Sequence, residues 1–276
     1  MLPDQSPPVY VERTPASALV GLVRRLWFLS AHTPGGSERI LPIPWVHAIV
    51  NLGDPYRVER QGDRIVGQQF DGAFVSGLQR SFLINSNPPH LYHVGAALEP
   101  WAWRAFGAEP YTDDVRDAAA VLPGLAQVRG VARAAASPEA ALDALEAALL
   151  ESLTGAGVDT VVVATARDIE DNPAQRVGDI ADHVGVSRSA LAPRFKRATG
   201  INPKQFADLH RFHEFLSMIA EPGRTWTDLI SRSSYYDQPH FIRTFTKFTG
   251  LTPRKYLRAL GEDGRAAPSF VAHQTE

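Results

Sequence analysis

An internal repeat in the last third of the chain constrains its fold more than any other feature. The segment FKRATGINPKQF, residues 195–206, aligns with FTKFTGLTPRKY, residues 245–256, with Phe, Thr, Gly and Pro at equivalent places. Upstream of the two copies are VGDIADHVGVSRSALAPRF and WTDLISRSSYYDQPHFIRTF, each typical of a helix, a tight turn and a second helix. Because self-similarity of this kind marks one supersecondary unit used twice, we expect two helix-turn-helix units.

Glycine and serine positions set the expected limits of these helices. In the first unit Gly185 suits a turn that needs a positive φ, and Ser187 can cap the helix that follows. Gly200 and Gly250 each precede an apolar residue and an x-Pro pair, which is typical of helix termination. The second helix of each unit should therefore run from a cap near residue 187 or 237 to one of these glycines.

The second helix of each unit is expected to bury one apolar stripe and expose the opposite face. The apolar residues recur at i, i+4 and i+7, so they share a face of the helix. These core positions are Leu191, Phe195 and Ala198 in the first unit, and Phe241, Phe245 and Phe248 in the second. Side chains on the outward faces remain available for contact with a partner.

Charge is distributed unevenly along the chain. Residues 171–262 carry 14 Lys and Arg against 9 Asp and Glu, whereas the formal net charge of the whole chain is -2. All the lysines lie in this basic segment: Lys196, Lys204, Lys247 and Lys255. A local positive charge beside two helix-turn-helix units favours a nucleic-acid partner, while a chance asymmetry between domains is the alternative.

The rest of the chain divides by composition. Residues 1–122 hold short apolar runs between turn signals, which predicts a β-rich domain that is a small barrel or a sandwich. Residues 123–170 predict a helical linker, with a helix over 137–153 that begins at Ser137 and Pro138. This helix could pack on the β-rich domain, on the helical domain or on a second copy of the chain. Residues 171–262 predict an all-α domain, and 263–276 a disordered tail. The overall class is α+β.

The motifs IADHVGVSRSAL, RFKRATGINP, YYDQPHF and FTKFTGLTPRKYL make residues 171–258 resemble the DNA-binding domain of the AraC/XylS family of bacterial transcription regulators. The resemblance implies a sequence-specific transcription regulator that reads two adjacent major-groove segments of double-stranded DNA. It also implies that a long helix, here Pro203 to about Ile219, joins the two units. The alternative function is a small-molecule-binding or interaction protein whose helical domain does not act on DNA, since such a protein could have the same helices.

Carried over by position, the resemblance assigns roles to the exposed residues. The expected base-reading residues are Arg188, Ser189, Ala192 and Pro193 in the first unit, and Gln238, Pro239, Ile242 and Arg243 in the second. Arg243 is the strongest of these, because a guanidinium can bridge O6 and N7 of guanine. The expected phosphate contacts are Arg194, Lys196, Arg197, Lys204, His240 and Lys247.

Three residues depart from the family's pattern. Pro193 lies inside the expected first recognition helix, where it removes a backbone donor, so we expect that helix to kink or end early. Base reading by the first unit is then in doubt. Ser234 replaces the usual turn glycine of the second unit, and Pro239 lies in the first turn of its helix, where proline is acceptable.

The N-terminal segments SERILPIPWVHAIVNLGDPYRV and GAALEPWAWRAF resemble the sensor-like domain of a subset of AraC-type regulators. The resemblance implies a cupin-like β-barrel, a small-molecule effector and a homodimer. The residues that could line an effector pocket, with core packing as the alternative, are Trp45, His47, Tyr56, Trp101 and Trp103. His90 and His93 have an odd spacing that points them to opposite faces of a strand, and no metal site is expected.

Several function classes find no support in the sequence. The chain has no cysteine, which excludes disulfides, thiolate zinc sites and a cysteine nucleophile. It also lacks the G-x-S-x-G, Walker and H-E-x-x-H motifs, so we expect neither an enzyme nor a cofactor. No membrane-spanning run and no signal peptide is evident, so a cytoplasmic protein is expected. RNA polymerase is a further candidate partner of a transcription regulator.

Overall fold

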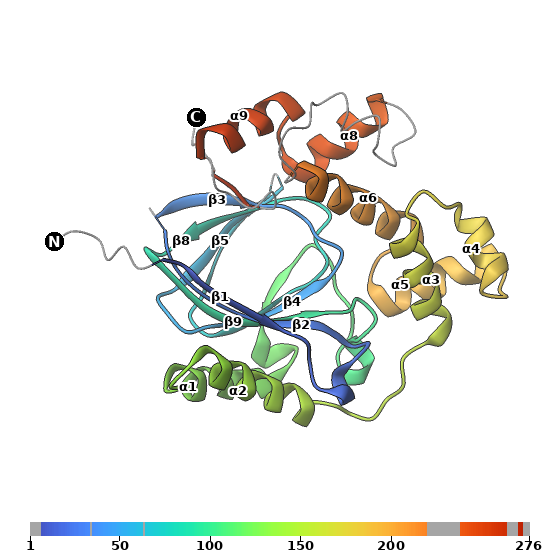
Figure 1. Cartoon of the computed structure of the whole chain (residues 1–276). Coiled ribbons are helices and arrows are strands. Elements are labelled where there is room, and N and C mark those ends of the chain that lie inside the picture. Colours follow the sequence, from blue (N-terminus) through green and yellow to red (C-terminus); the bar gives the residue numbers. More distant parts are fainter. Residues whose placement is uncertain (1–6, 34, 63, 220–237, 264–269, 273–276) are drawn as a thin grey trace.

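The computed structural model of the chain describes residues 7–33, 35–62, 64–219, 238–263 and 270–272. Its N-terminal part consists of two antiparallel sheets (Figure 1). In spatial order, the first sheet contains β1 (Val9–Arg13), β2 (Val23–His32), β9 (His90–Leu98), β4 (Val46–Asn51), β7 (Ala73–Ser76) and β10 (Val115–Asp117). The second contains β11 (Phe270–Ala272), β3 (Gly36–Ile40), β8 (Leu83–Asn87), β5 (Tyr56–Gln61) and β6 (Arg64–Phe70).

The β-rich domain is a sandwich and not a closed barrel. Among the strands that the structure describes, none pairs one sheet with the other, and β1 and β10 remain at the edges of the first sheet. The central strand β9 shows how the two faces are used. His93 lies between the sheets against the ring of Tyr56, whereas Val94 and Ala96 are fully buried on the other face. This alternation is the period of two that a sheet buried on both faces requires.

Helices cover the outer face of the first sheet. Short 3-10 helices occur at η1 (Ser17–Leu19), η2 (Trp103–Phe106), η3 (Ala118–Ala120) and η4 (Pro123–Gln127), followed by α1 (Val128–Arg133) and α2 (Pro138–Glu151). Helix α2 begins as expected, because Ser137 accepts a hydrogen bond from the amide of Ala140 and Pro138 follows it. It packs on β2 and β9, with Leu142, Leu145 and Leu149 fully buried (Figure 1). Of the three packing partners left open, the structure thus shows the β-rich domain.

The remaining helices form the C-terminal domain. They are α3 (Thr160–Asp171), α4 (Val177–His183), α5 (Arg188–Thr199), α6 (Pro203–Ile219), α8 (Gln238–Thr249) and α9 (Pro253–Asp263). Helix α6 covers the expected range of the connecting helix. Its buried Phe206 contacts Phe195 of α5, and its Phe212 contacts Phe245 of α8. The second helices of both units are therefore anchored on one aromatic spine. No helix within the described ranges is long and apolar enough to cross a membrane.

The helical domain is docked on the sandwich. Arg24 of β2 donates to Glu170 of α3 at 2.7 Å and to the buried Glu99 at 3.3 Å. Trp45 meets His213 of α6 edge to face, with ring centroids 4.7 Å apart. Polar and aromatic contacts thus join the two domains, and one continuous buried core runs through both.

The structure differs from the expected disordered tail at residues 270–272. This segment forms β11, which pairs with β3 and is the edge strand of the second sheet (Figure 1). Without this segment β3 would be at the edge of the sheet, and the unpaired backbone groups of such an edge can order a short extended segment. The C-terminal end is therefore tied to the N-terminal sandwich, although the other tail residues lie outside the described ranges.

Candidate nucleic-acid interface

The first unit, α4 and α5, has the turn and cap that its sequence predicts. Gly185 has φ of +73° in the turn, and the Ser187 hydroxyl accepts a hydrogen bond from the amide of Ala190. Leu191 and Phe195 are fully buried. At the C-terminal end of α5, Gly200 adopts φ of +85° and its amide donates a hydrogen bond to the carbonyl of Lys196. A core-facing stripe and a left-handed glycine cap therefore fix the orientation of this helix.

Pro193 does not end α5. The helix continues from Arg188 to Thr199 with the proline inside it, so the expectation of an early end is wrong. Proline removes one amide donor, and the carbonyl of Ser189 loses its usual partner. Both Pro193 and Ser189 are exposed, so water can satisfy that carbonyl. The packing of Leu191 and Phe195 on either side holds the helical path.

The expected base-reading residues of the first unit lie mainly at the surface. Arg188 and Ser189 are exposed at the start of α5, whereas Ala192 is half-buried. The exposed Pro193 occupies the middle of the helix face. This unit thus offers hydrogen-bonding side chains at its first turn, and proline beyond it.

The second unit presents a different surface on the same scaffold. Phe241 and Phe245 are fully buried in α8, while Pro239, Ile242 and Arg243 are exposed. Ile242 is 40% exposed, which is high for a large aliphatic side chain and leaves it available to a partner. Gln238 begins the helix, but its side chain lies outside the described part of the chain, as do Ser234 and the first helix of this unit.

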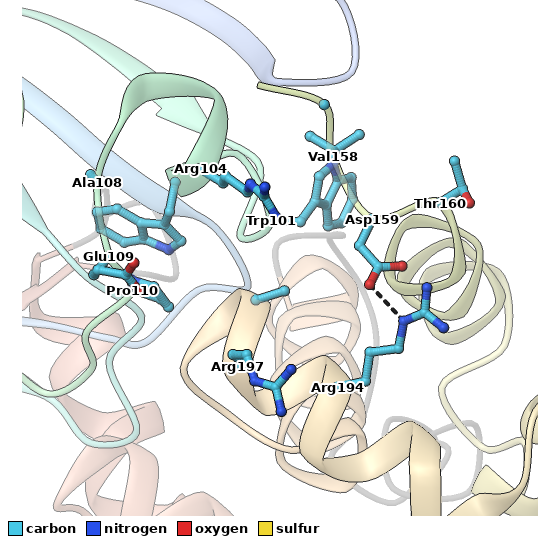
Figure 2. A pocket seen from close by; sticks show the side chains of 13 residues that line it. Trp101, Arg104, Ala108, Glu109, Pro110, Val158, Asp159, Thr160, Arg194 and Arg197 are labelled. Carbon is cyan, nitrogen blue, oxygen red and sulfur yellow. Dashed lines mark hydrogen bonds and ion pairs between the residues drawn. The ribbon is translucent and has the colours of Figure 1, made fainter. Parts of the chain in front are cut away.

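The cations assigned to phosphates separate into two groups. Lys196, Lys204 and Lys247 are exposed on α5, α6 and α8, and His240 is half-buried at the start of α8. Arg194 and Arg197, in contrast, line a cleft between α5 and the sandwich (Figure 2). Four of these six residues are thus separate from the cleft, whereas these two arginines face the N-terminal domain.

The cleft has a volume of about 690 Å³ and lies where both domains and the linker meet. Its lining comes from three places: Trp101, Trp103 and Arg104 of the N-terminal domain, residues 157–160 of the linker, and Arg194, Arg197 and Ala198 of α5. Figure 2 shows Trp101 beside Val158, and Arg194 pointing to Asp159. Arg194 donates from Nε to Oδ2 of Asp159 at 2.6 Å. The lining thus combines two buried tryptophans with three exposed arginines, Arg104, Arg194 and Arg197, and with the carboxylates of Glu109 and Asp159.

Only two of the five aromatic residues expected at an effector pocket line this cleft, namely Trp101 and Trp103. Trp45 instead packs against His213 and lies under the guanidinium groups of Arg24 and Arg25. Tyr56 lies in the core between the two sheets.

His47 is near Trp27, with ring centroids 6.2 Å apart. Burial, together with the charge of Arg25, lowers the pKa of His47 to about 4, so its imidazole is neutral near pH 7. Trp45, His47 and Tyr56 thus lie in packed positions away from this cleft.

The two histidines of β9 lie on opposite faces, as their spacing predicts. His93 faces Tyr56 between the sheets, and burial lowers its pKa to about 4. The ring of His90 stacks on His32, and Nε2 lies 2.9 Å from the hydroxyl of Ser30. No group of three His, Cys, Asp or Glu side chains suited to a metal occurs within the described ranges.

Sequence reasoning missed Asp159 and Arg104 at the cleft. Asp159 is the N-cap of α3, where Oδ1 accepts from the amides of Val161 and Val162 at 3.0 and 3.2 Å. The signal was present, because Asp followed by an apolar run is typical of a helix start. Its partner Arg194 is 35 residues away and could not be found from local spacing.

Comparisons with known proteins divide the chain in the same way. Residues 180–259 match the model of a helix-turn-helix domain, and residues 11–115 match a domain of unknown function, DUF6597. An uncharacterized HTH-type transcriptional regulator, YtdP of Bacillus subtilis, is 30% identical over 78 residues, which are 28% of this chain and 10% of the relative. A putative AraC-like transcription regulator of Streptomyces lividans is 30% identical over 106 residues, which are 37% of this chain and 35% of the relative.

The chain therefore spans about a tenth to a third of the length of these relatives. Among solved structures, one of ToxT from Vibrio cholerae O395 superimposes with a TM-score of 0.50 at 11% identity, covering 91% of this chain and 98% of ToxT. At this identity the likeness concerns the fold alone. The helix-turn-helix match agrees with the tandem repeat, and part of the chain is similar to a putative AraC-like transcription regulator.

Proposed function

We propose that this chain is a sequence-specific DNA-binding transcription regulator that reads two adjacent major-groove segments. One observation carries the proposal: α5 and α8 bury equivalent aromatic residues on the same helix, α6, and expose their opposite faces. A shared rigid helix fixes the separation of two recognition helices, as reading of successive grooves requires. The exposed lysines on three of these helices supply phosphate contacts and hence affinity.

The second unit supports the stronger base contact in this proposal. Arg243 is exposed on α8 and can donate two parallel hydrogen bonds to guanine O6 and N7. Its neighbour Ile242 is exposed as well and can contact the methyl group of thymine. An arginine and an aliphatic residue on adjacent positions therefore provide a donor and an apolar surface for two neighbouring bases.

Selection of DNA fragments by the purified full-length chain tests this proposal. Fragments retained by the protein at two salt concentrations are sequenced, and a shared motif with two half-elements about one helical turn apart is expected. Retention without any shared motif would contradict sequence-specific reading. If no duplex is retained at either salt concentration, the alternative of an interaction protein that does not act on DNA would replace the proposal.

The cleft supports a further part of the proposal, modulation by a small molecule. The half-buried Pro110 and Val158 offer apolar surface beside the two tryptophans, and the exposed Arg104 and Arg197 offer positive charge, so the effector would be anionic with an apolar body. Compounds that raise the Tm of the wild-type chain but not of Arg104→Ala would support it, because Arg104 is exposed and its removal leaves the core intact. Self-association of the chain and its contact with RNA polymerase are further proposals. Sedimentation of the purified chain tests self-association.

A further inference from the structure

The linker holds one arginine of the first recognition helix in an ion pair. Nε of Arg194 donates to Oδ2 of Asp159 at 2.6 Å, and the two side chains lie at the mouth of the cleft (Figure 2). They are 42% and 29% exposed, so solvent and a large partner can reach the pair. The guanidinium that sequence assigns to a DNA phosphate is thus already bound to an anionic oxygen of the same chain.

Asp159 is well fixed for this role. One oxygen, Oδ1, accepts from the amides of Val161 and Val162 at the start of α3, which leaves Oδ2 for Arg194. Burial acts to raise the pKa of Asp159, but the hydrogen bonds from Arg194 and these amides outweigh it and the pKa falls below its ordinary value. The carboxylate is therefore charged at neutral pH, and its position is set by the helix that it caps.

The linker that carries Asp159 is anchored to the N-terminal domain. The amide of Thr154 donates to the carbonyl of Ala105 in η2 at 2.9 Å. Glu170, near the other end of α3, accepts from Arg24 of β2 at 2.7 Å. Both ends of the segment that presents the carboxylate are thus held by the sandwich, so the N-terminal domain sets where Asp159 lies.

Within the described part of the second unit, α8 has no equivalent of this pair. The repeat offset places Thr244 of α8 where α5 has Arg194, and threonine carries no charge. Among the described residues, the ion pair of Asp159 is therefore with the first unit.

We infer that Asp159 is an intramolecular competitor of the DNA backbone, occupying on Arg194 the place of a phosphate oxygen. This inference rests on the proposed function. Carboxylate and phosphate oxygens accept hydrogen bonds from guanidinium in the same way, so DNA gains the Arg194 contact only by displacing Asp159. Because exposed ion pairs are weak, the competition lowers DNA affinity roughly two- to fivefold and not by orders of magnitude.

The test compares four full-length variants in their affinity for one random-sequence duplex, measured by fluorescence anisotropy at a fixed salt concentration. Asp159→Asn removes the charge but keeps a residue that caps helices well, so the fold is expected to stand, as the Tm will show. We expect it to bind DNA roughly two- to fivefold more tightly than wild type. Asp143→Asn is the matched control. Asp143 lies on α2, away from α5, and its carboxylate pairs with Arg13 at 2.8 Å.

The decisive comparison is made in the Arg194→Ala background. If Asp159 acts through Arg194, Asp159→Asn changes nothing there, and Asp143→Asn leaves affinity unchanged in the wild-type background. An equal gain in the presence and absence of Arg194 would overturn the inference, since it would reflect general charge repulsion. If Asp159→Asn binds DNA no more tightly than wild type, the inference is overturned and the regulator proposal stands. If no variant binds DNA, both are overturned.

Discussion

The two helix-turn-helix units share a scaffold and differ in the surface that it carries. Phe195 and Phe245 are both fully buried at equivalent places of α5 and α8, and Gly200 and Gly250 end both helices with positive φ. On the outward face, however, Pro193 stands where the second unit has Arg243. Core positions have few acceptable residues because neighbours surround them, whereas exposed positions can diverge. We therefore expect the second unit to dominate base reading and the first to contribute mainly backbone contacts.

The largest difference between the units should appear in stability. Phe245 of α8 contacts four aromatic rings, those of Phe212, Phe215, Phe241 and Tyr256. Phe195 of α5 contacts the ring of Phe206. Phe195→Ala and Phe245→Ala should each lower the free energy of unfolding by about 3–5 kcal/mol, with the greater loss for Phe245→Ala. Urea denaturation of the full chain measures both. Equal losses would mean that the two cores are equally able to relax around the cavity.

Acid should affect both units together, because it acts on the helix that they share. Burial, with smaller effects of charged neighbours, lowers the pKa of His210 and His213 on α6 to about 4. The charged groups that influence them are Arg24, Arg25, Arg167 and Glu170. The unfolded chain takes up these protons near pH 6.5 and the folded chain only near pH 4, so the free energy of unfolding falls as pH decreases through this window.

Each of these histidines contributes at most about 3 kcal/mol to that loss. His213→Gln should therefore lose less stability than wild type between pH 6.5 and 4, as measured by the Tm at each pH. The unchanged histidines His47 and His93, whose pKa values burial also lowers to about 4, provide a common background. A variant that loses stability as steeply as wild type would contradict the assignment to α6.

A single change should relax base reading by the second unit. Arg243→Ala should relax the preference at one base position and weaken specific binding by about 1–3 kcal/mol, while binding to random DNA changes less. Affinities for the selected site and for single-base variants of it measure the effect. Equal losses on all sequences would show that Arg243 contacts a phosphate.

The reciprocal change would make the first unit more like the second. Pro193→Arg places a guanidinium at the repeat equivalent of Arg243 and restores the amide that proline lacks. A new base preference in the first half-element is expected, and repeated selection of DNA fragments detects it. An unchanged motif would mean that the face of α5 does not reach the bases.

The smallest effect is expected from a phosphate contact of the first unit. Lys196 is exposed on α5, apart from the cleft. Lys196→Ala should weaken binding equally on specific and random DNA and lower the slope of log K against log salt by about one. Titrations at several salt concentrations measure this slope. An unchanged slope would mean that Lys196 does not contact the DNA backbone, and the first unit would then have one phosphate contact fewer.

Local patterns predicted the helical part well. Gly185, Ser187 and Gly200 act through their own backbone and near neighbours, so their roles in the turn, the cap and the helix end could be inferred from spacing. Pro193 was misjudged for the opposite reason. Proline disfavours a helix interior, but α5 continues through Pro193, where Leu191 and Phe195 are buried on either side, and this packing is a tertiary effect.

The N-terminal domain shows a second limit of sequence reasoning. The strands were expected, but barrel and sandwich differ in which strands pair over long distances, such as β4 with β9 and β3 with β11. Trp45 and Trp101 look equally able to line a pocket in the sequence. The docking of the helical domain separates them, because α6 covers Trp45 while α5 leaves a cleft beside Trp101.

Residue order alone predicts two helix-turn-helix units, a connecting helix and a distinct β-rich domain, since helix caps, turns and apolar periodicity are short-range properties. The pairing of Arg194 with Asp159, the position of the cleft and the strand formed by residues 270–272 follow from packing alone. Each of these joins residues far apart in the chain, and their encounter depends on how two separately patterned domains share one buried core.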